Sequence, residues 1–121
     1  MKDFRSLNVW EKAHRLTLTI YKAIDNFSGQ QSQYLADQLR EVSTFIPARI
    51  AEAYGQQVDD EALRSMLQVV GAVSKLEYLL MLACDLGHIS NEVYETIGNE
   101  IADVRKHVVK DIQYLTCRLD Y

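Results

Sequence analysis

Residues 32–54 read SQYLADQLREVSTFIPARIAEAY, and this stretch decides the fold class. Its apolar residues recur every three or four positions, at Leu35, Leu39, Val42, Ile46, Ile50 and Ala53. That spacing places them on one face of a helix, so the sequence predicts an amphipathic helix over this range. Pro47 lies inside it. Because proline lacks the backbone donor and clashes with the carbonyl four residues earlier, we expect a kink between Ser43 and Pro47.

The same spacing recurs in three other segments. One predicted helix begins near Val9, where Asn8 and Glu11 resemble a capping box, and its stripe runs to Phe27. Another covers about residues 60–86, with Asp59 or Asp60 as its cap and Gly87 as its stop. The last follows Ser90, a plausible cap, and continues to the end of the chain; its stripe is Val93, Ile97, Ile101, Val104, Val108, Ile112, Leu115 and Leu119.

Length and composition agree with an all-α protein. The chain has 121 residues, five glycines and one proline, which provide too few turns for a sandwich or barrel of many short strands. Four amphipathic helices joined by short loops pack most simply as an antiparallel up-down-up-down four-helix bundle. We therefore expect residues 1–121 to form one such domain.

Charge and apolar runs indicate the compartment. With 13 basic and 17 acidic residues the net charge is −4, which argues against coating nucleic acid by bulk charge. The N-terminus lacks the apolar core of a secretory signal, and the longest apolar run, Tyr78 to Cys84, is shorter than the roughly 20 residues of a membrane span. We expect a cytoplasmic protein in which Cys84 and Cys117 are buried free thiols.

Motifs for catalysis or metal binding are weak. Glu11 and His14 have the spacing of ligands in di-iron bundles, but the chain has no second Glu-x-x-His, and the pairs Asp85 with His88 and Asp103 with His107 fit poorly. Serine elbows and glycine-rich phosphate loops are absent from the sequence. We therefore predict no catalytic residues, no metal, no cofactor and no small-molecule substrate. Two carboxylates in apolar stretches, Glu52 and Glu77, are expected to pair with Arg40 or Arg49 or to lie partly exposed.

Basic residues recur on one side of the first helix. Lys12, Arg15 and Lys22 share a face, with Arg5 just upstream, and Arg105, Lys106 and Lys110 of the last helix could join them if the two helices are neighbours. A solvated face is the simpler interpretation. The alternative is a surface that contacts the phosphates of a nucleic acid, which needs several such charges to converge.

The third predicted helix is apolar around most of its circumference from Tyr78 to Cys84. A helix of that kind is buried on more than one side, and seven tyrosines in the chain also suit protein interfaces. We therefore predict an association interface that includes Tyr54, Tyr78, Leu79 and Leu82.

The segment QLREVSTFIPARIAEAYG, Gln38–Gly55, resembles the second helix of four-helix-bundle proteins encoded in intervening sequences of bacterial 23S rRNA genes. The opening Phe4 to Leu7, leading to Val9 to Ala13, is similar to that family's start, and Leu67 to Gly87 is similar to its third helix. The chain departs from the family at Arg49, where asparagine is usual, and at Gln56, Ala72 and Lys75. The apolar positions are kept, so the fold should survive these changes.

The resemblance implies no enzyme. It implies a homo-oligomer, a ring of five bundles, and a relation to accessory proteins of diversity-generating retroelements that bind nucleic acid and a reverse transcriptase. On the family pattern Arg40, Pro47, Glu52 and Glu77 are structural-motif residues. The first hypothesis is accordingly a non-enzymatic interaction module, and the alternative is a nucleic-acid-binding accessory protein.

Overall fold

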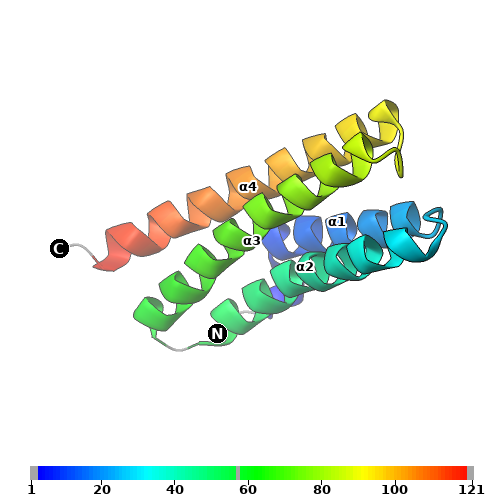
Figure 1. Cartoon of the computed structure of the whole chain (residues 1–121). Coiled ribbons are helices and arrows are strands. Elements are labelled where there is room, and N and C mark those ends of the chain that lie inside the picture. The colour runs from blue at the N-terminus through cyan, green and yellow to red at the C-terminus, as the bar shows by residue number, and fades with distance from the viewer. Residues whose placement is uncertain (1–2, 57, 120–121) are drawn as a thin grey trace.

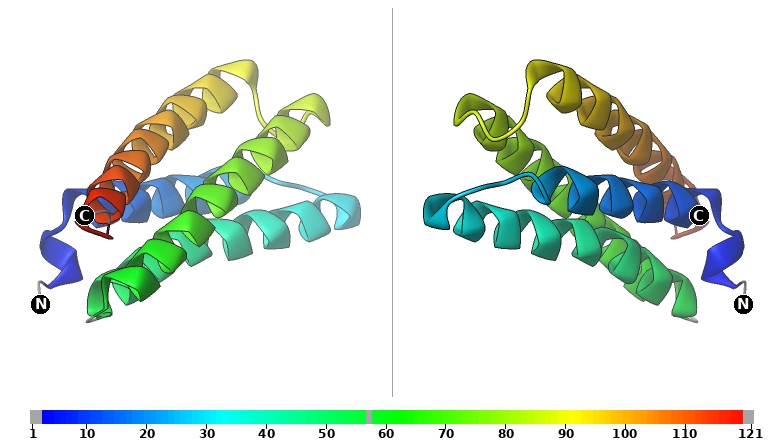
Figure 2. Two further views of the ribbon diagram at one scale, coloured as in Figure 1. Left: turned by 90° about the vertical axis from the view of Figure 1, so that its left-hand side faces the viewer. Right: turned by 90° about the vertical axis from the view of Figure 1, so that its right-hand side faces the viewer.

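The computed structural model describes residues 3–56 and 58–119 and shows four long helices (Figure 1). A short 3-10 helix precedes them, and the elements are η1 (Phe4–Ser6), α1 (Asn8–Ile24), α2 (Gln30–Gly55), α3 (Asp59–Asp85) and α4 (Asn91–Leu119). Successive long helices run in opposite directions in the views of Figures 1 and 2. The predicted all-α four-helix bundle is confirmed, and each predicted helix is present within two residues of its expected start.

The helices are arranged so that each has two neighbours. Helix α1 packs against α2 and α4, and α3 packs against the same two helices. Over the described residues, the backbones of α1 and α3 make no close contact, and neither do those of α2 and α4. These two pairs are therefore the diagonals of the bundle. The adjacency of α1 and α4, on which the predicted basic face depends, is confirmed.

The buried residues form one hydrophobic cluster at the centre of the four helices. It contains the whole predicted stripe of α2, from Leu35 to Ala53, and the largest fully buried side chains include Leu16, Ile20, Ile46, Ile50, Met66, Leu76, Ile97 and Ile101. The predicted stripe of α4 is wrong at its start, because Val93 is 38% exposed. Val93 lies in the first turn of α4, next to the loop from α3.

Helix ends follow local backbone chemistry. Ser90 caps α4 as predicted, because its hydroxyl accepts a hydrogen bond from the amide of Val93 at 3.1 Å. Gly87 ends α3 with φ +82°. The amide of His88 donates to the carbonyl of Ala83 and that of Gly87 to Cys84, which is the hydrogen-bond pattern of a Schellman motif.

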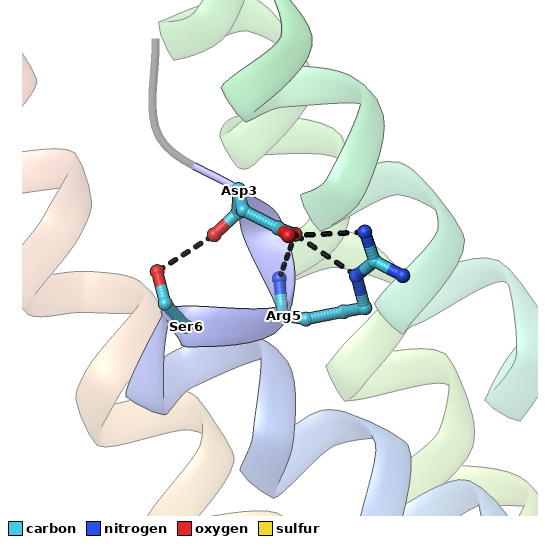
Figure 3. A network of polar contacts seen from close by, with 3 residues as sticks. All are labelled: Asp3, Arg5 and Ser6. Carbon is cyan, nitrogen blue, oxygen red and sulfur yellow. Dashed lines mark hydrogen bonds and ion pairs between the residues drawn. The ribbon is translucent and has the colours of Figure 1, made fainter.

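The capping box predicted at Asn8 and Glu11 is wrong. Helix α1 begins at Asn8, one residue earlier than predicted, directly after η1. Its N-cap is therefore Leu7, whose side chain makes no capping hydrogen bond. Neither Asp59 nor Asp60 caps α3, whose N-cap is Val58. In place of a capping box, the side chain of Asp3 accepts the amide of Arg5 at 3.0 Å and so caps η1 (Figure 3).

Helix α2 continues through Pro47 as one uninterrupted helix. The carbonyl of Ser43, which would bond an amide at position 47, instead accepts the hydroxyl of Thr17 on α1 at 2.7 Å. Both side chains are buried. Because Pro47 has no amide hydrogen, the Ser43 carbonyl of α2 is available to Thr17, and this hydrogen bond joins α1 to α2.

The two cysteines differ from the prediction. Cys117 is exposed, and Cys84 is half-buried, with its thiol donating to the side-chain oxygen of Asn91 at 3.2 Å. Cys117 follows the last buried residue of α4, Leu115, and lies on the opposite side of that helix from the core.

Candidate interaction surfaces

The predicted basic face on α1 and α4 is largely neutralised by ion pairs within the chain. The ammonium of Lys12 lies 2.7 Å from the carboxylate of Asp103, across the contact between the two helices. A hydrogen bond from Lys12 lowers the pKa of the Asp103 carboxyl. This ion pair joins α1 to α4. Because the carboxylate of Asp103 neutralises the charge of Lys12, Lys12 adds little positive charge to the basic face.

Three further arginines of the predicted face are also paired. Arg5 bonds Asp3 through its guanidinium at 3.0 Å (Figure 3). Arg15 lies 2.6 Å from Glu11 on the same helix. The guanidinium of Arg105 donates two hydrogen bonds to the carboxylate of Glu77, at 3.0 and 3.1 Å, and so joins α4 to α3. The side chain of Arg105 is therefore directed toward α3 and away from α1. The structure therefore does not bring Arg105 into the basic face.

The other three predicted contacts are exposed lysines. Lys22 on α1, and Lys106 and Lys110 on α4, form no ion pair among the residues that the structure describes. Lys106 and Lys110 are one helical turn apart and point to the same side of α4. These lysines are the part of the basic face that is free to meet an anionic partner.

The three charged structural-motif residues also form ion pairs. Arg49 is the partner of Glu52, as predicted, at 3.3 Å. The partner of Glu77 is Arg105, and Arg40 pairs with Asp37 at 2.9 Å. Both glutamates are about half exposed, at 57% and 52% of their side-chain surface, so neither is a buried carboxylate poised for acid-base chemistry.

The residues weighed as metal ligands have other partners. The ring of His14 stacks on Trp10 with 5.0 Å between centroids, and Phe4 meets Trp10 edge-on at the same distance. His107 bonds the carbonyl of Asp103 through Nδ1 at 2.8 Å. Over residues 3–56 and 58–119, three or more His, Cys, Asp or Glu side chains nowhere gather closely enough to hold a metal ion.

Of the four predicted interface residues, Leu79 requires correction. It is 8% exposed and belongs to the chain's own hydrophobic cluster. Leu82 and Tyr54 are half-buried against that core. Tyr54 also donates its hydroxyl to the carboxylate of Asp111 on α4, and burial, followed by this hydrogen bond, raises the pKa of the phenol. Only Tyr78, 55% exposed, stands free of the bundle.

Tyr78 belongs to a larger uncharged surface on the outer side of α3. Its neighbours at helical spacing are Leu67, Ser74 and Met81, and the leucine and methionine are 51% and 41% exposed. We call these four residues the α3 ridge. Residues 65–74 of α3 contain no charged side chain. On the side of α4, the guanidinium of Arg105 pairs with Glu77 and also donates to the hydroxyl of Ser74 at 3.4 Å, so one charge touches the ridge.

A second uncharged surface lies between η1, α1 and α2, on the side of the bundle away from α3. It is a groove of about 420 Å³, which we call the Trp10 groove, lined by Phe4, Trp10, His14, Thr17, Leu18, Tyr21, Thr44, Pro47, Ala48 and Ala51. The hydroxyls of Tyr21 and Thr44 meet at 3.1 Å across it. Leu18 and Tyr21 are 50% and 41% exposed at its edge.

Sequence reasoning did not find the Trp10 groove. The available signal was that Leu18 and Tyr21 are apolar or aromatic residues outside the buried stripe of the first helix. Because a groove needs residues from three elements, the pattern within one helix could not show it.

Over the described residues the structure is a four-helix bundle with two outer surfaces, the α3 ridge and the Trp10 groove, whose own residues carry no charge. The family model for the 23S rRNA-intervening sequence protein matches residues 5–110. The chain therefore belongs to the 23S rRNA-intervening sequence protein family.

One solved structure shares the fold. It is the crystal structure of a protein with unknown function from the S23 ribosomal protein family of Bacteroides thetaiotaomicron VPI-5482. The two chains are 25% identical, and the similarity covers 86% of this chain and 97% of that one with a TM-score of 0.78. No curated protein matches the chain. Neither the family description nor that of the similar structure names an enzymatic activity.

Proposed function

We propose that this protein is a non-enzymatic interaction module that assembles with further copies of itself, and that the α3 ridge is part of the contact. The observation that supports this is that α3 is only partly buried within the chain. It is long and apolar enough to span a membrane by length and composition, yet only 33% of its most apolar 18-residue window is buried within the chain. On its outer side the side chains of Leu67, Tyr78 and Met81 are 51%, 55% and 41% exposed, and a partner would cover them.

The geometry of α3 favours protein as that partner over lipid. Met66, Val69, Val73, Leu76 and Leu80 are buried against the neighbouring helices. The same helix carries Lys75 and Glu77 on its exposed side, which would be costly in hydrocarbon. Burying the exposed parts of Leu67, Tyr78 and Met81 in an interface would contribute roughly 1 kcal/mol each. A cytoplasmic location is part of this proposal.

The test is the mass of the assembly in solution. Light scattering coupled to size-exclusion chromatography should give a multiple of the chain mass for the wild-type protein, and the family resemblance implies five copies. Tyr78→Asp should reduce that mass to a single chain, because it places a charge in an uncharged contact. Tyr34→Asp is the matched control, since Tyr34 is 73% exposed and lies outside both surfaces. A wild-type protein that stays a single chain at high concentration would contradict the proposal.

A second candidate function is nucleic-acid binding, and the exposure of Lys22, Lys106 and Lys110 favours it. Within residues 3–56 and 58–119 these lysines form no ion pair, whereas Arg5, Lys12, Arg15 and Arg105 would have to leave their carboxylate partners to bind phosphate. Fluorescence anisotropy with structured RNA and with duplex DNA, across a salt series, tests this directly. Binding should weaken steeply with salt, and Lys106→Glu with Lys110→Glu should abolish it. Binding that is unchanged by this double substitution would contradict a role for α4.

A further inference from the structure

A cavity of about 290 Å³ lies between α2 and α3. It is lined by Gln38, Glu41, Val42 and Phe45 of α2 and by Gln68, Gly71, Ala72 and Lys75 of α3, and we call it the α2–α3 cavity. None of these residues belongs to the α3 ridge or to the Trp10 groove. Small-molecule sites have volumes of about 300–1,000 Å³, so this cavity suits a ligand at the lower end of that range.

The α2–α3 cavity has a charged end and an apolar end. Because α2 and α3 run in opposite directions, residues early in α2 lie beside residues late in α3 (Figure 1). Glu41 and Lys75 therefore share one end, and Phe45 lies toward the other. Between them lie Val42, which is 5% exposed, and Ala72. A ligand that fills the cavity meets charges at one end and apolar side chains at the other.

The two charges at the first end are opposite in sign and do not pair. Within residues 3–56 and 58–119, neither Glu41 nor Lys75 forms an ion pair. The charged residues that precede or follow them are already paired, Arg40 with Asp37, Arg49 with Glu52, and Glu77 with Arg105. A carboxylate accepts hydrogen bonds from an ammonium group, and a lysine donates them to a carboxylate. This end can therefore hold a ligand that carries both charges close together.

The apolar end is fixed by a neighbouring arginine. The guanidinium of Arg49 lies 4.9 Å from the centroid of the Phe45 ring, which is the geometry of a cation–π contact. The same guanidinium bonds the carboxylate of Glu52 at 3.3 Å, so its charge is neutralised within the chain. The ring is thus held in position without a ligand, and an apolar side chain can pack against Phe45 and Val42.

Gly71 leaves space in the wall of the cavity. It lies in the interior of α3, where glycine is less favourable than alanine. A Cβ at this position would meet nothing within 4 Å, so packing inside the chain does not require a glycine. The methyl group of an alanine would take up part of the space that a ligand needs.

We propose that the α2–α3 cavity binds a free α-amino acid with an apolar side chain, in its zwitterionic form. Glu41 accepts hydrogen bonds from the ammonium group, Lys75 donates to the carboxylate, and the side chain packs against Phe45. The end of a protein chain carries only one of the two charges and is not equivalent. This site goes beyond the proposed function, which needs no small ligand.

Titration of nitrogen-15-labelled protein with L-phenylalanine tests the proposal. The amide signal of Gly71 should shift until it saturates, with a Kd of about 0.1–1 mM for a ligand of this size. N-acetyl-phenylalanine lacks the ammonium group and phenylalanine amide lacks the carboxylate, so each should bind roughly tenfold more weakly. Absence of a shift at about 10 mM L-phenylalanine, or equal binding of the three compounds, would overturn the inference.

Two charge substitutions assign the ends of the ligand, with calorimetry as the readout. Lys75→Gln should weaken the binding of L-phenylalanine but not that of phenylalanine amide, which has no carboxylate to lose. Glu41→Gln should weaken L-phenylalanine but not N-acetyl-phenylalanine. Both side chains are exposed, so the fold should be kept, and circular dichroism checks it. L-phenylalanine binding that either substitution leaves unchanged would mean that the ligand is not held between these two residues.

A glycine substitution separates loss of the cavity from loss of the fold. Gly71→Ala should weaken L-phenylalanine binding at least roughly tenfold while it raises the thermal midpoint, because alanine favours helix interiors. Gly98→Ala is the matched control, since it makes the same change inside α4, away from the cavity, and should keep the binding. If Gly71→Ala binds L-phenylalanine as the wild-type protein does, the ligand lies elsewhere and the inference is wrong.

Discussion

Thr17 is the residue through which α1 meets the proline of α2. Its hydroxyl lies 2.7 Å from the carbonyl of Ser43 and 3.0 Å from that of Ala13, so one proton serves two acceptors. The shorter contact goes to the carbonyl that Pro47 leaves without an amide partner. The Ser43 carbonyl would destabilise the bundle if it were buried without a hydrogen-bond donor. This explains why the polar residue Thr17 lies among apolar residues at the contact between α1 and α2.

Thr17→Val should therefore lower the free energy of unfolding by about 1–3 kcal/mol, since the valine has the same shape but donates no hydrogen bond. In a Pro47→Ala background the same substitution should cost much less, because the alanine amide can bond the Ser43 carbonyl. Urea unfolding followed by circular dichroism measures both differences. Equal losses in the two backgrounds would show that Thr17 does not compensate for the proline.

Tyr54 gives the bundle a dependence on alkaline pH. Its folded-state pKa is raised, first by burial and then by the hydrogen bond to Asp111, above the ordinary value of 10.0. Above that ordinary value the unfolded chain loses this proton and the folded chain keeps it, so the unfolded state is favoured as the pH rises. The stability contributed by Tyr54 is complete below pH 10 and declines above it.

Tyr54→Phe should remove this alkaline decline. It should also lower the free energy of unfolding at pH 7 by about 1.5 kcal/mol, because a hydrogen bond to a carboxylate is lost. Thermal melts at pH 7 and pH 10.5 compare the two proteins. Tyr114→Phe, on an exposed tyrosine of the same region, is the control and should keep the alkaline decline. An identical decline in Tyr54→Phe would assign the effect to other groups.

At the scale of the element, the end of α3 depends on Gly87. Its φ of +82° lies in the left-handed region, which costs other residues about 1 kcal/mol. Gly87→Ala should destabilise the bundle by about that amount, although a Cβ would meet nothing within 4 Å. The penalty comes from the backbone alone.

Gly98 provides the matched control because it lies inside α4 and also has open space at its Cβ. Gly98→Ala should stabilise the protein by about 0.5–1 kcal/mol, since alanine favours helix interiors. Thermal unfolding of the two variants should thus shift in opposite directions. A shift of the same sign in both would mean that the left-handed backbone at Gly87 is not what ends α3.

Ion pairs connect elements in a way that helix periodicity does not predict. Helical spacing predicts that Lys12 shares a face with Arg15 and Lys22, and that Arg105 joins them if the first and last helices are neighbours. In the structure Lys12 joins α1 to Asp103 of α4, and Arg105 joins α4 to Glu77 of α3. Spacing along one helix shows which side a charge takes, but its partner lies on another helix, dozens of residues away.

At the scale of the whole molecule, the nature of the assembly contact can be tested with salt. None of the four residues of the α3 ridge is charged, so the mass of the assembly should stay constant between 50 and 500 mM NaCl. Sedimentation velocity at constant protein concentration measures this. A mass that falls as salt rises would show that ion pairs hold the copies together, and would place the contact on a charged side of the bundle.

The sequence by itself determined the four helices, the stop at Gly87, the cap at Ser90 and the buried stripe of α2, because these depend on the spacing and chemistry of residues near one another in the chain. Family membership also followed from local motifs. Tertiary structure alone decided that Leu79 is a core residue, that Thr17 bonds the Ser43 carbonyl, and that Phe4, Trp10 and Pro47 line one groove. The physical reason is that burial, ion pairing and grooves depend on the rotation and distance of one helix relative to another. Periodicity within a single helix does not contain that information.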